Sequence, residues 1–375
     1  MKLPPDLLRP GGTSVRSVLA AAIDATGMER IGGEWLDGRH VLGLPAARRA
    51  CVVLVDGLGH TQLTERSGHF PFLRTLLRDS STLETVVPST TAAAITSIGT
   101  GLTPGETWML GYTVLEPRSG ELLNMIKWDQ GFVTPEDWQR RDTLAQRLVS
   151  PVRFAAVGPG RFVGSGLNRA AFRGARDVSA EDLADRVDIT VAELRSGSAD
   201  VVYLYWGEVD HVGHVSGWGS WEWGEEASRT DRELRRLAAT LPRDTLLVIT
   251  ADHGMVDVAE SIDAARVPEL VRGVELVSGE PRAMHLHTAE DGVLERWRDH
   301  LGDRAWILPR PEALALYPDL DPRFARAIGD VVVFMRGRTV VVDSRTQTPA
   351  SMALIGVHGS LTPEEMLVPL MVTVT

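Results

Sequence analysis

The sequence predicts an α/β protein with a doubly wound, mainly parallel sheet and helices on both faces. Short, nearly continuous apolar runs alternate with longer amphipathic stretches, as expected when both faces of a sheet are covered by helices. Five runs rich in β-branched residues are the predicted strands: 51–55, 82–87, 152–157, 200–206 and 245–250. The predicted helices lie at about 179–196 and 225–240, where charged residues recur at helical spacing.

The segment from residue 258 to residue 345 has a different pattern. It mixes a predicted helix around 290–301 with four short predicted strands, at 275–278, 284–288, 331–335 and 338–342. We therefore expect residues 1–257 and 346–375 to form an α/β core that carries the functional site. Residues 258–345 are expected to form a small α+β cap packed over that site.

Composition and charge limit the possible function classes. The chain has 375 residues, of which 43% are hydrophobic and 24% charged, an ordinary globular composition. Its net charge of −11 argues against non-specific binding to nucleic acid, because that binding needs clustered Lys and Arg. The single cysteine, Cys51, lies inside a predicted strand, where we expect a small buried hydrophobic residue and not a nucleophile.

Residues 1–10 lack the apolar segment of a secretory signal peptide, and no run reaches the roughly 18 apolar residues of a membrane span. With no disulfide framework either, we expect a cytoplasmic protein that does not enter a membrane. The sequence does not indicate an oligomeric state.

Acidic residues and histidines follow several of the predicted strands. Because parallel strands end at the same edge of a sheet, these side chains are expected to lie close together. Carboxylate and imidazole ligands suit Zn²⁺, with Mn²⁺ also possible, and the set is large enough for two divalent ions. The candidate ligands are Asp56, Asp210, His214, Asp252, His253 and His358.

Local spacing adds two geometric expectations. Asp210 and His214 are four residues apart, so a helical turn would place both on one face. Asp252 and His253 are adjacent and would point in opposite directions on an extended strand. A turn at Gly254 must therefore bring them together.

The segment Val-Pro-Ser-Thr-Thr-Ala-Ala-Ala at 87–94 offers a hydroxyl nucleophile. Thr90 and Thr91 precede a predicted helix whose N-terminal amides would favour an alkoxide and a phosphate oxygen. A neighbouring metal ion would activate the hydroxyl further. Alternatively, Ser89 or Thr90 acts only as the helix N-cap, and both roles can coexist.

Taken in order, these motifs resemble the alkaline phosphatase superfamily and, within it, the nucleotide pyrophosphatase/phosphodiesterase family. The resemblance covers residues 51–370 and rests on Asp56-Gly, Pro88-Ser-Thr-Thr-Ala with Thr100-Gly101, Asp210-x-x-Gly-His214, Asp252-His253-Gly-Met and His358-Gly. It implies a nucleophilic Thr91 that forms a phosphothreonine intermediate. It also implies one metal ion surrounded by Asp56, Thr91, Asp252 and His253, and a second held by Asp210, His214 and His358.

The sequence departs from this family at Ala94, where members typically have an asparagine that contacts a phosphate oxygen. Asn124 is a candidate replacement, and Trp128 in the same segment is a further candidate for substrate contact. Arg282 and His285 are candidates on a predicted cap strand, with a solvated hairpin as the alternative.

Other aromatic residues and histidines are less informative. Trp218, Trp221 and Trp223 would form either a stacking wall for the substrate or part of the core. The histidines without companions at ligand spacing, which we expect to be structural or exposed, are His60, His69 and His211.

The sequence thus predicts a dimetal-dependent hydrolase of phosphate esters, most consistent with a nucleotide pyrophosphatase/phosphodiesterase. Its partner would be a small phosphorylated substrate such as a nucleotide. A phosphomonoesterase or phosphonate hydrolase remains open because of Ala94. A phosphosugar mutase and a non-catalytic metal- or phosphate-binding protein are alternatives of other classes, whereas a sulfatase is disfavoured because Thr91 cannot be oxidised to formylglycine.

Overall fold

The structure is a computed structural model that describes residues 14–31 and 42–375. The expected lack of a signal peptide concerns residues 1–10, which lie outside these ranges. No helix within them has the length and apolarity needed to cross a bilayer.

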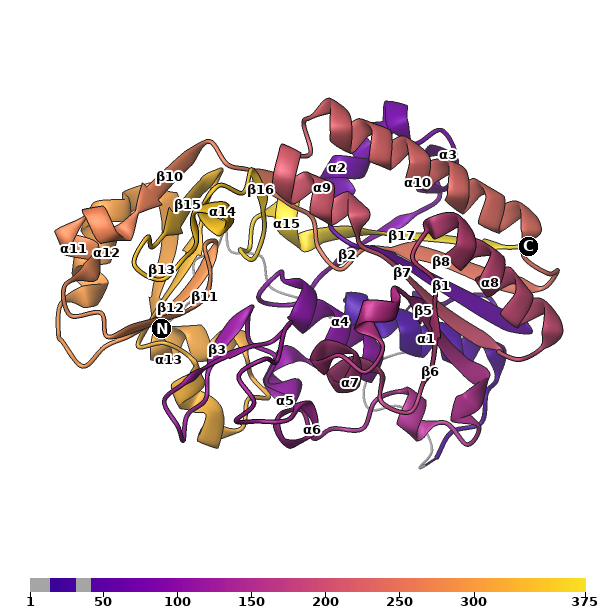
Figure 1. Ribbon diagram of the computed structural model, residues 1–375, viewed down its shortest axis with the longest axis horizontal. Coiled ribbons are helices and arrows are strands. Elements are labelled where there is room, and N and C mark those ends of the chain that lie inside the picture. Colours follow the sequence, from indigo (N-terminus) through magenta and orange to yellow (C-terminus); the bar gives the residue numbers. More distant parts are fainter. Residues whose placement is uncertain (1–13, 32–41) are drawn as a thin grey trace.

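The centre of the molecule is a seven-stranded sheet with the order β2-β17-β8-β1-β7-β5-β6 (Figure 1). The five strands from β8 to β6 are parallel, and β17 is antiparallel to both of its neighbours. The mainly parallel α/β fold predicted from the sequence is therefore confirmed. The strands are β1 (Arg49–Val55), β2 (Ser81–Glu84), β5 (Phe154–Gly158), β6 (Arg176–Ser179), β7 (Val201–Trp206), β8 (Thr245–Thr250) and β17 (Leu367–Val374).

Helices cover both faces of this sheet. Figure 1 shows α8 (Leu183–Ser196), α9 (Glu208–Ser216) and α10 (Trp221–Thr240) on one face. It shows α1 (Val18–Thr26), α4 (Thr91–Thr100) and α7 (Gly166–Phe172) on the other. Between the two layers the central strands are almost wholly buried, which explains their continuous apolar sequences.

Several predicted elements differ from the structure at their ends, including the helix predicted at about 225–240, which begins at Trp221. The predicted helix at 179–196 starts at Leu183, because residues 176–179 form the edge strand β6 and Asp182 caps the helix by accepting a hydrogen bond from the Ala184 amide. The predicted strand at 82–87 ends at Glu84, and the residues after it lead to Thr90, the N-cap position of α4. Cys51 is buried in the core, as expected, and burial raises the pKa of its thiol to about 12.

A second, antiparallel sheet with the order β11-β12-β14-β13 lies beside the first (Figure 1). Its strands are β11 (Leu276–Glu280), β12 (Ala283–His287), β13 (Ala305–Pro309) and β14 (Val331–Met335). One face packs against α11 (Pro268–Val271) and α12 (Val293–Leu301), and the other against apolar residues between 87 and 138. Strand β13 was not predicted. The division of the chain into a core and a cap at residues 258–345 stays a prediction.

Short elements connect these layers. The strands among them are β3 (Thr113–Leu115), β4 (Leu122–Asn124), β9 (Val256–Asp257), β10 (Glu260–Asp263), β15 (Thr339–Val342) and β16 (Gly356–Val357). The helices are α2 (His60–Glu65), α3 (Leu73–Leu77), α5 (Pro104–Thr107), α6 (Pro135–Trp138), α13 (Arg310–Ala313), α14 (Pro349–Met352) and α15 (Pro363–Met366).

Candidate active site

The adjacent strands β1 and β8 deliver the first group of site residues. Asp56 directly follows β1, and Asp252 lies two residues beyond β8. The Gly57 amide donates to Asp252 Oδ1 at 3.1 Å, which ties the two strand ends together. His253 Nε2 lies 3.5 Å from Asp56 Oδ1 and 3.3 Å from Asp252 Oδ2, with all three side chains buried.

The chain bends at Asp252 and not at the expected Gly254, but close packing still requires glycine at position 254. A Cβ atom on Gly254 would lie 2.1 Å from the carbonyl oxygen of Glu364. The Gly254 amide also donates to the Glu365 carbonyl at 2.9 Å. The loop after β8 therefore packs directly against the chain near α15, which fixes the direction of Asp252 and His253.

The second group comes from α9 and the loop after β16. His214 Nε2 lies 3.2 Å from Asp210 Oδ2, as their spacing of four residues predicts. His358 Nε2 lies 3.9 Å from Asp210 Oδ1. The ring of His358 stacks on that of His253 with centroids 3.6 Å apart, so the two groups are in contact.

Each of the three imidazoles is oriented by a backbone carbonyl. The Nδ1 atom of His214 bonds to the Gly356 oxygen at 2.7 Å, that of His253 to the Gly254 oxygen at 3.0 Å, and that of His358 to the Ser89 oxygen at 2.9 Å. A carbonyl only accepts hydrogen bonds, so in each ring Nδ1 is the donor. In the neutral rings, Nε2 then presents a lone pair to the site.

The carboxylates present acceptors to the same space. Among the described residues, Asp56 Oδ1, Asp210 Oδ1 and Asp252 Oδ2 are buried without a hydrogen-bond partner. Burial and the neighbouring carboxylates raise the pKa of Asp56 well above its usual value, and burial also raises the pKa of Asp252. Burial acts in the same direction on Asp210, but the charge of His214 and its hydrogen bond outweigh it and lower that pKa.

Unpaired carboxylate oxygens and oriented imidazole nitrogens form a donor set that fits divalent cations. Two groups of donor atoms lie within 4.8 Å of one another: Asp56 with Asp252 and His253, and Asp210 with His253 and His358. The structure thus brings all the predicted ligands together, with His253 between the two groups.

The N-terminus of α4 supplies the hydroxyl. Thr91 is the first residue of the helix, and its Oγ1 lies 3.1 Å from His253 Nε2. Thr90 occupies the N-cap position, but its side chain accepts no capping hydrogen bond. Ser89 instead donates to the Ser360 carbonyl at 2.6 Å, which holds the loop that carries His358. Of the hydroxyls considered from the sequence, Thr91 is the one in contact with the ligand cluster.

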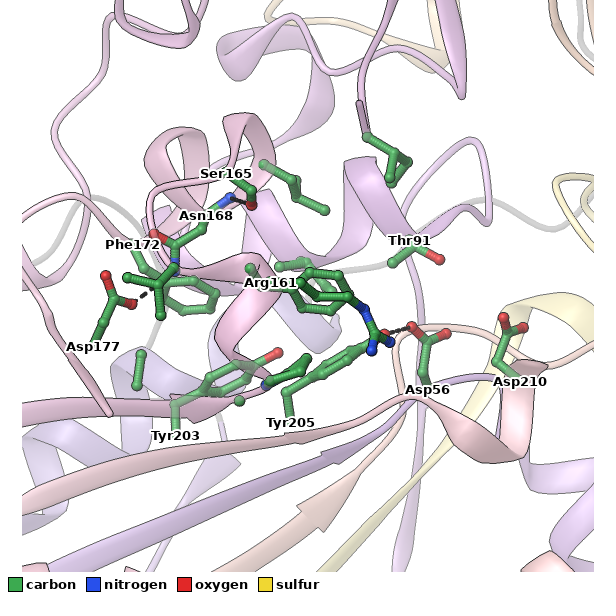
Figure 2. Close-up of a pocket in the computed structure, with 18 of the residues that line it drawn as sticks. Asp56, Thr91, Arg161, Ser165, Asn168, Phe172, Asp177, Tyr203, Tyr205 and Asp210 are labelled. Carbon is green, nitrogen blue, oxygen red and sulfur yellow. Dashed lines mark hydrogen bonds between the residues drawn. The ribbon is translucent and has the colours of Figure 1, made fainter. Parts of the chain in front are cut away.

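A cavity of about 570 Å³ opens beside this cluster. Figure 2 shows Asp56, Thr91 and Asp210 at one end of it, and Asn168 and Asp177 at the other. The wall between them is largely aromatic and apolar, and it includes Phe162, Phe172, Tyr203, Tyr205, Ile95 and Leu167. The Tyr205 hydroxyl donates to Asp56 Oδ2 at 2.5 Å, which links this wall to the ligand cluster.

Sequence reasoning missed the residues of this wall. Tyr203 and Tyr205 were assigned only to a strand. Their signal was nevertheless present, since two tyrosines two residues apart on a strand share a face, and this strand leads directly to Asp210. Phe162, Phe172 and Asp177 had no comparable signal.

Two predicted substrate contacts require correction. Asn124 is almost fully buried, and its Oδ1 accepts from the backbone amides of Ile126 at 3.0 Å and Lys127 at 2.8 Å. Trp128 donates from Nε1 to the Met125 carbonyl at 2.7 Å. Neither side chain lines the cavity, whereas Ile126 and Lys127 do. Within this segment, the residues that line the pocket are therefore not the predicted ones.

The predicted contacts from the cap strand also require correction. Arg282 is fully buried and forms a bidentate ion pair with Glu365, with N–O distances of 3.0 and 2.6 Å. His285 is buried in the second sheet and accepts from the Gly329 amide at 3.1 Å. Neither lines the cavity. The alternating pattern indicated a strand face, but that face is buried and does not line the cavity.

The tryptophans after His214 do not form a stacking wall in the cavity. Trp223 belongs to the core and packs edge-on against Phe70, with centroids 5.9 Å apart. Trp218 packs against the same core, and Trp221 is 72% exposed. The histidines expected to be structural or exposed lie outside the ligand cluster: His69 bonds to Ser228, His211 is exposed, and His60 is half-buried.

Solved structures with similar folds were found over most of the chain. Murine ectonucleotide pyrophosphatase / phosphodiesterase 5 superposes with a TM-score of 0.66 at 15% identity, covering 86% of this chain and 87% of that one. Phosphonoacetate hydrolase from Sinorhizobium meliloti 1021, in complex with phosphonoformate, superposes with a TM-score of 0.67 at 21% identity, covering 92% and 94%. These likenesses support the fold assignment.

A curated relative, GPI ethanolamine phosphate transferase 2 of Candida glabrata, is 27% identical over 245 residues. The match includes 59% of this chain, which spans only about a quarter (27%) of that relative's length. The model of the type I phosphodiesterase / nucleotide pyrophosphatase family matches residues 50–361, which include every candidate ligand and Thr91. The chain therefore belongs to the type I phosphodiesterase / nucleotide pyrophosphatase family, as its sequence motifs indicated.

Proposed function

We propose that this protein hydrolyses phosphate diesters, with Thr91 as the nucleophile and two divalent cations bound by the surrounding Asp and His side chains. One observation carries the proposal. The Thr91 hydroxyl lies 3.1 Å from His253 Nε2, inside a cluster in which three buried carboxylate oxygens have no hydrogen-bond partner among the described residues. Hydrogen bonding alone does not account for such a concentration of unpaired acceptors, whereas bound cations would.

Asp56, Asp252 and His253 would hold one ion, and Asp210, His214 and His358 the other, with Zn²⁺ or Mn²⁺ as the best match to the donors. When bound, the ions would stabilise the alkoxide of Thr91 and the charge on the leaving oxygen. The chain itself orients the reactants. The N-terminal amides of α4 point toward the space beside Thr91 and favour a phosphate oxygen there.

Hydrolysis would then occur in two steps. Thr91 Oγ1 attacks phosphorus, and the bond to one ester oxygen breaks to release an alcohol. Water hydrolyses the resulting phosphothreonine, which releases a phosphate monoester and restores the hydroxyl. Transfer of the phosphoryl group to an acceptor other than water would use the same first step.

The pocket supports a diester over a smaller substrate. Its volume of about 570 Å³ and its aromatic wall suit an ester substituent of substantial size next to the phosphate. A nucleotide is one such substrate. A phosphonate hydrolase is the second candidate, because Ala94 on α4 has no side chain that could hydrogen-bond a phosphate oxygen of a diester.

The test compares hydrolysis of bis-p-nitrophenyl phosphate and p-nitrophenyl phosphate by the zinc- or manganese-loaded protein. Thr91→Ala should abolish turnover. Ser97→Ala should retain it, because this substitution removes a buried hydroxyl of the same helix that has no hydrogen-bond partner in the described part of the chain. Faster turnover of the diester supports the proposal, and faster turnover of the monoester contradicts it. Equal activity of Thr91→Ala and wild type would exclude Thr91 as the nucleophile.

A further inference from the structure

The end of the pocket remote from the ligand cluster carries a polar pair that the proposed reaction does not use. Asn168 on α7 donates from Nδ2 to Asp177 Oδ1 on β6 at 2.9 Å. The backbone amide of Asn168 donates to Ser165 Oγ at 3.4 Å. All three residues line the pocket, and Figure 2 shows them on the opposite side from Thr91 and Asp210.

The Asp177 carboxylate has acceptor capacity left for a ligand. It is exposed, and within the described ranges it forms no ion pair with a basic side chain. Arg161, a basic residue on the pocket wall, lies 3.9 Å from Glu181 instead. A carboxylate accepts about four hydrogen bonds, and one is occupied by Asn168. A group that meets Asp177 in the pocket would therefore be favoured if it donates an N–H bond.

The wall between the two ends selects for a ring-shaped group. The rings of Phe172 and Tyr203 lie 4.6 Å apart, and those of Phe162 and Tyr205 lie 5.8 Å apart. The Tyr203 hydroxyl is a second polar group on this wall. It is buried, and it has no hydrogen-bond partner among the residues described. Aromatic walls of this kind favour flat, apolar groups that stack or pack edge-on.

We propose that the pocket binds the non-phosphate part of the substrate as a ring-sized group carrying a hydrogen-bond donor, either a neutral N–H or an ammonium group. Asp177, positioned by Asn168, is the specificity-determining residue that accepts this donor. The inference rests on the proposed function, because the phosphate of the same molecule would lie at Thr91. The two ends of the pocket then recognise opposite properties, an anion at the ligand cluster and a donor at Asp177.

The test measures the affinity of three phosphate monoesters for the zinc-loaded protein by calorimetry: phenyl, 4-aminophenyl and 4-(aminomethyl)phenyl phosphate. The second ligand carries a neutral donor and the third a cation. Wild-type protein should bind a donor-bearing ligand about tenfold more tightly than phenyl phosphate, the low end for a hydrogen bond to a charged group. Asp177→Ala should reduce this ratio to about one. Because Asp177 is exposed, the variant is expected to fold normally.

Asp185→Ala is the matched control, because it removes an exposed carboxylate from α8 that does not line the pocket. It should leave the ratio unchanged. Equal affinity for all three ligands, no binding of any of them, or a preference that survives in Asp177→Ala would overturn the inference. Thr91-dependent hydrolysis of phenyl p-nitrophenyl phosphate tests the proposed function separately. The proposed function and the role of Asp177 can therefore fail independently of each other.

Discussion

Removing the Arg282 side chain should destabilise the protein strongly, although Arg282 lies outside the pocket. Both side chains of the Arg282–Glu365 pair are fully buried. Arg282 makes two hydrogen bonds to Glu365 and a third to the Thr339 carbonyl at 2.7 Å. In Arg282→Met the apolar stem is largely kept, so the cavity is small. The Glu365 carboxylate, however, stays buried without its cation.

That uncompensated charge sets the size of the expected loss in free energy of unfolding. After the substitution, the donors left to Glu365 among the described residues are the Ser360 amide at 3.0 Å and the Thr362 hydroxyl at 2.6 Å. Breaking a buried pair from one side costs about 3–5 kcal/mol. Ser360 lies two residues after His358, and the Glu365 carbonyl holds the Gly254 amide. We therefore expect weaker metal binding in addition to lower stability.

Urea-induced unfolding, monitored by tryptophan fluorescence, measures the change in the free energy of unfolding. Arg323→Met is the control, because Arg323 pairs with Asp321 at 2.6 Å but its side chain is 75% exposed. An exposed pair contributes about 0–1 kcal/mol. If Arg282→Met lost no more free energy of unfolding than the control, the reasoning about the buried pair would be refuted.

Three further predictions concern the site and its surroundings. Gly57→Ala should lower metal affinity and turnover, because its Cβ would lie 2.9 Å from Asp210 at φ +72°. Gly27→Ala is the control, at φ +70° with no atom of the described residues within 4 Å of the added Cβ, and should show only the conformational cost in a thermal melt. Removing divalent ions with a chelator should lower the melting temperature. Adding the free ion at 100 times its Kd should restore about 2.7 kcal/mol of free energy of unfolding. An unchanged melting temperature would argue against a metal site. Burial raises the pKa of Glu280 to about 8, so the folded state retains a proton that the unfolded state has lost above its ordinary value of 4.5. The resulting stabilisation is complete below that value and is lost as pH rises to about 8, so melts of Glu280→Gln at pH 5 and pH 8 should show the variant gaining stability relative to wild type as pH increases.

The fold and the ligand cluster could be predicted because both follow from local pattern. Apolar runs such as 245–250 are typical of strands covered on both faces, and the carboxyl ends of parallel strands meet at one edge. Asp56 and Asp252 were therefore expected to be neighbours before any long-range contact was known. His358 follows the short strand β16 outside the main sheet, so the strand-end argument does not apply to it, and its assignment to the second metal ion came from the family resemblance.

The errors have a different physical origin, since they depend on partners distant in sequence. Arg282 could not be recognised as structural because its partner, Glu365, is 83 residues away. Strand β17 was missed although Leu367–Val374 is apolar. It contains Pro369, which usually argues against an interior strand. Residues 367–370 pair only with β2 and residues 371–374 only with β8, so Pro369 lies in the half of the strand that does not contact β8. The cytoplasmic location stays a prediction.

The position of β17 has a consequence for synthesis of the chain. β17 lies between β8 and β2 in the sheet. The ribosome makes residues 251–366 after β8 and before β17. Until β17 emerges from the ribosome, a nascent chain that has already assembled β8 and β1 exposes a hydrophobic strand with unpaired backbone groups. Such an edge is prone to pair with other chains. We therefore expect the interval between translation of β8 and of β17 to be the period when this protein depends most on chaperones.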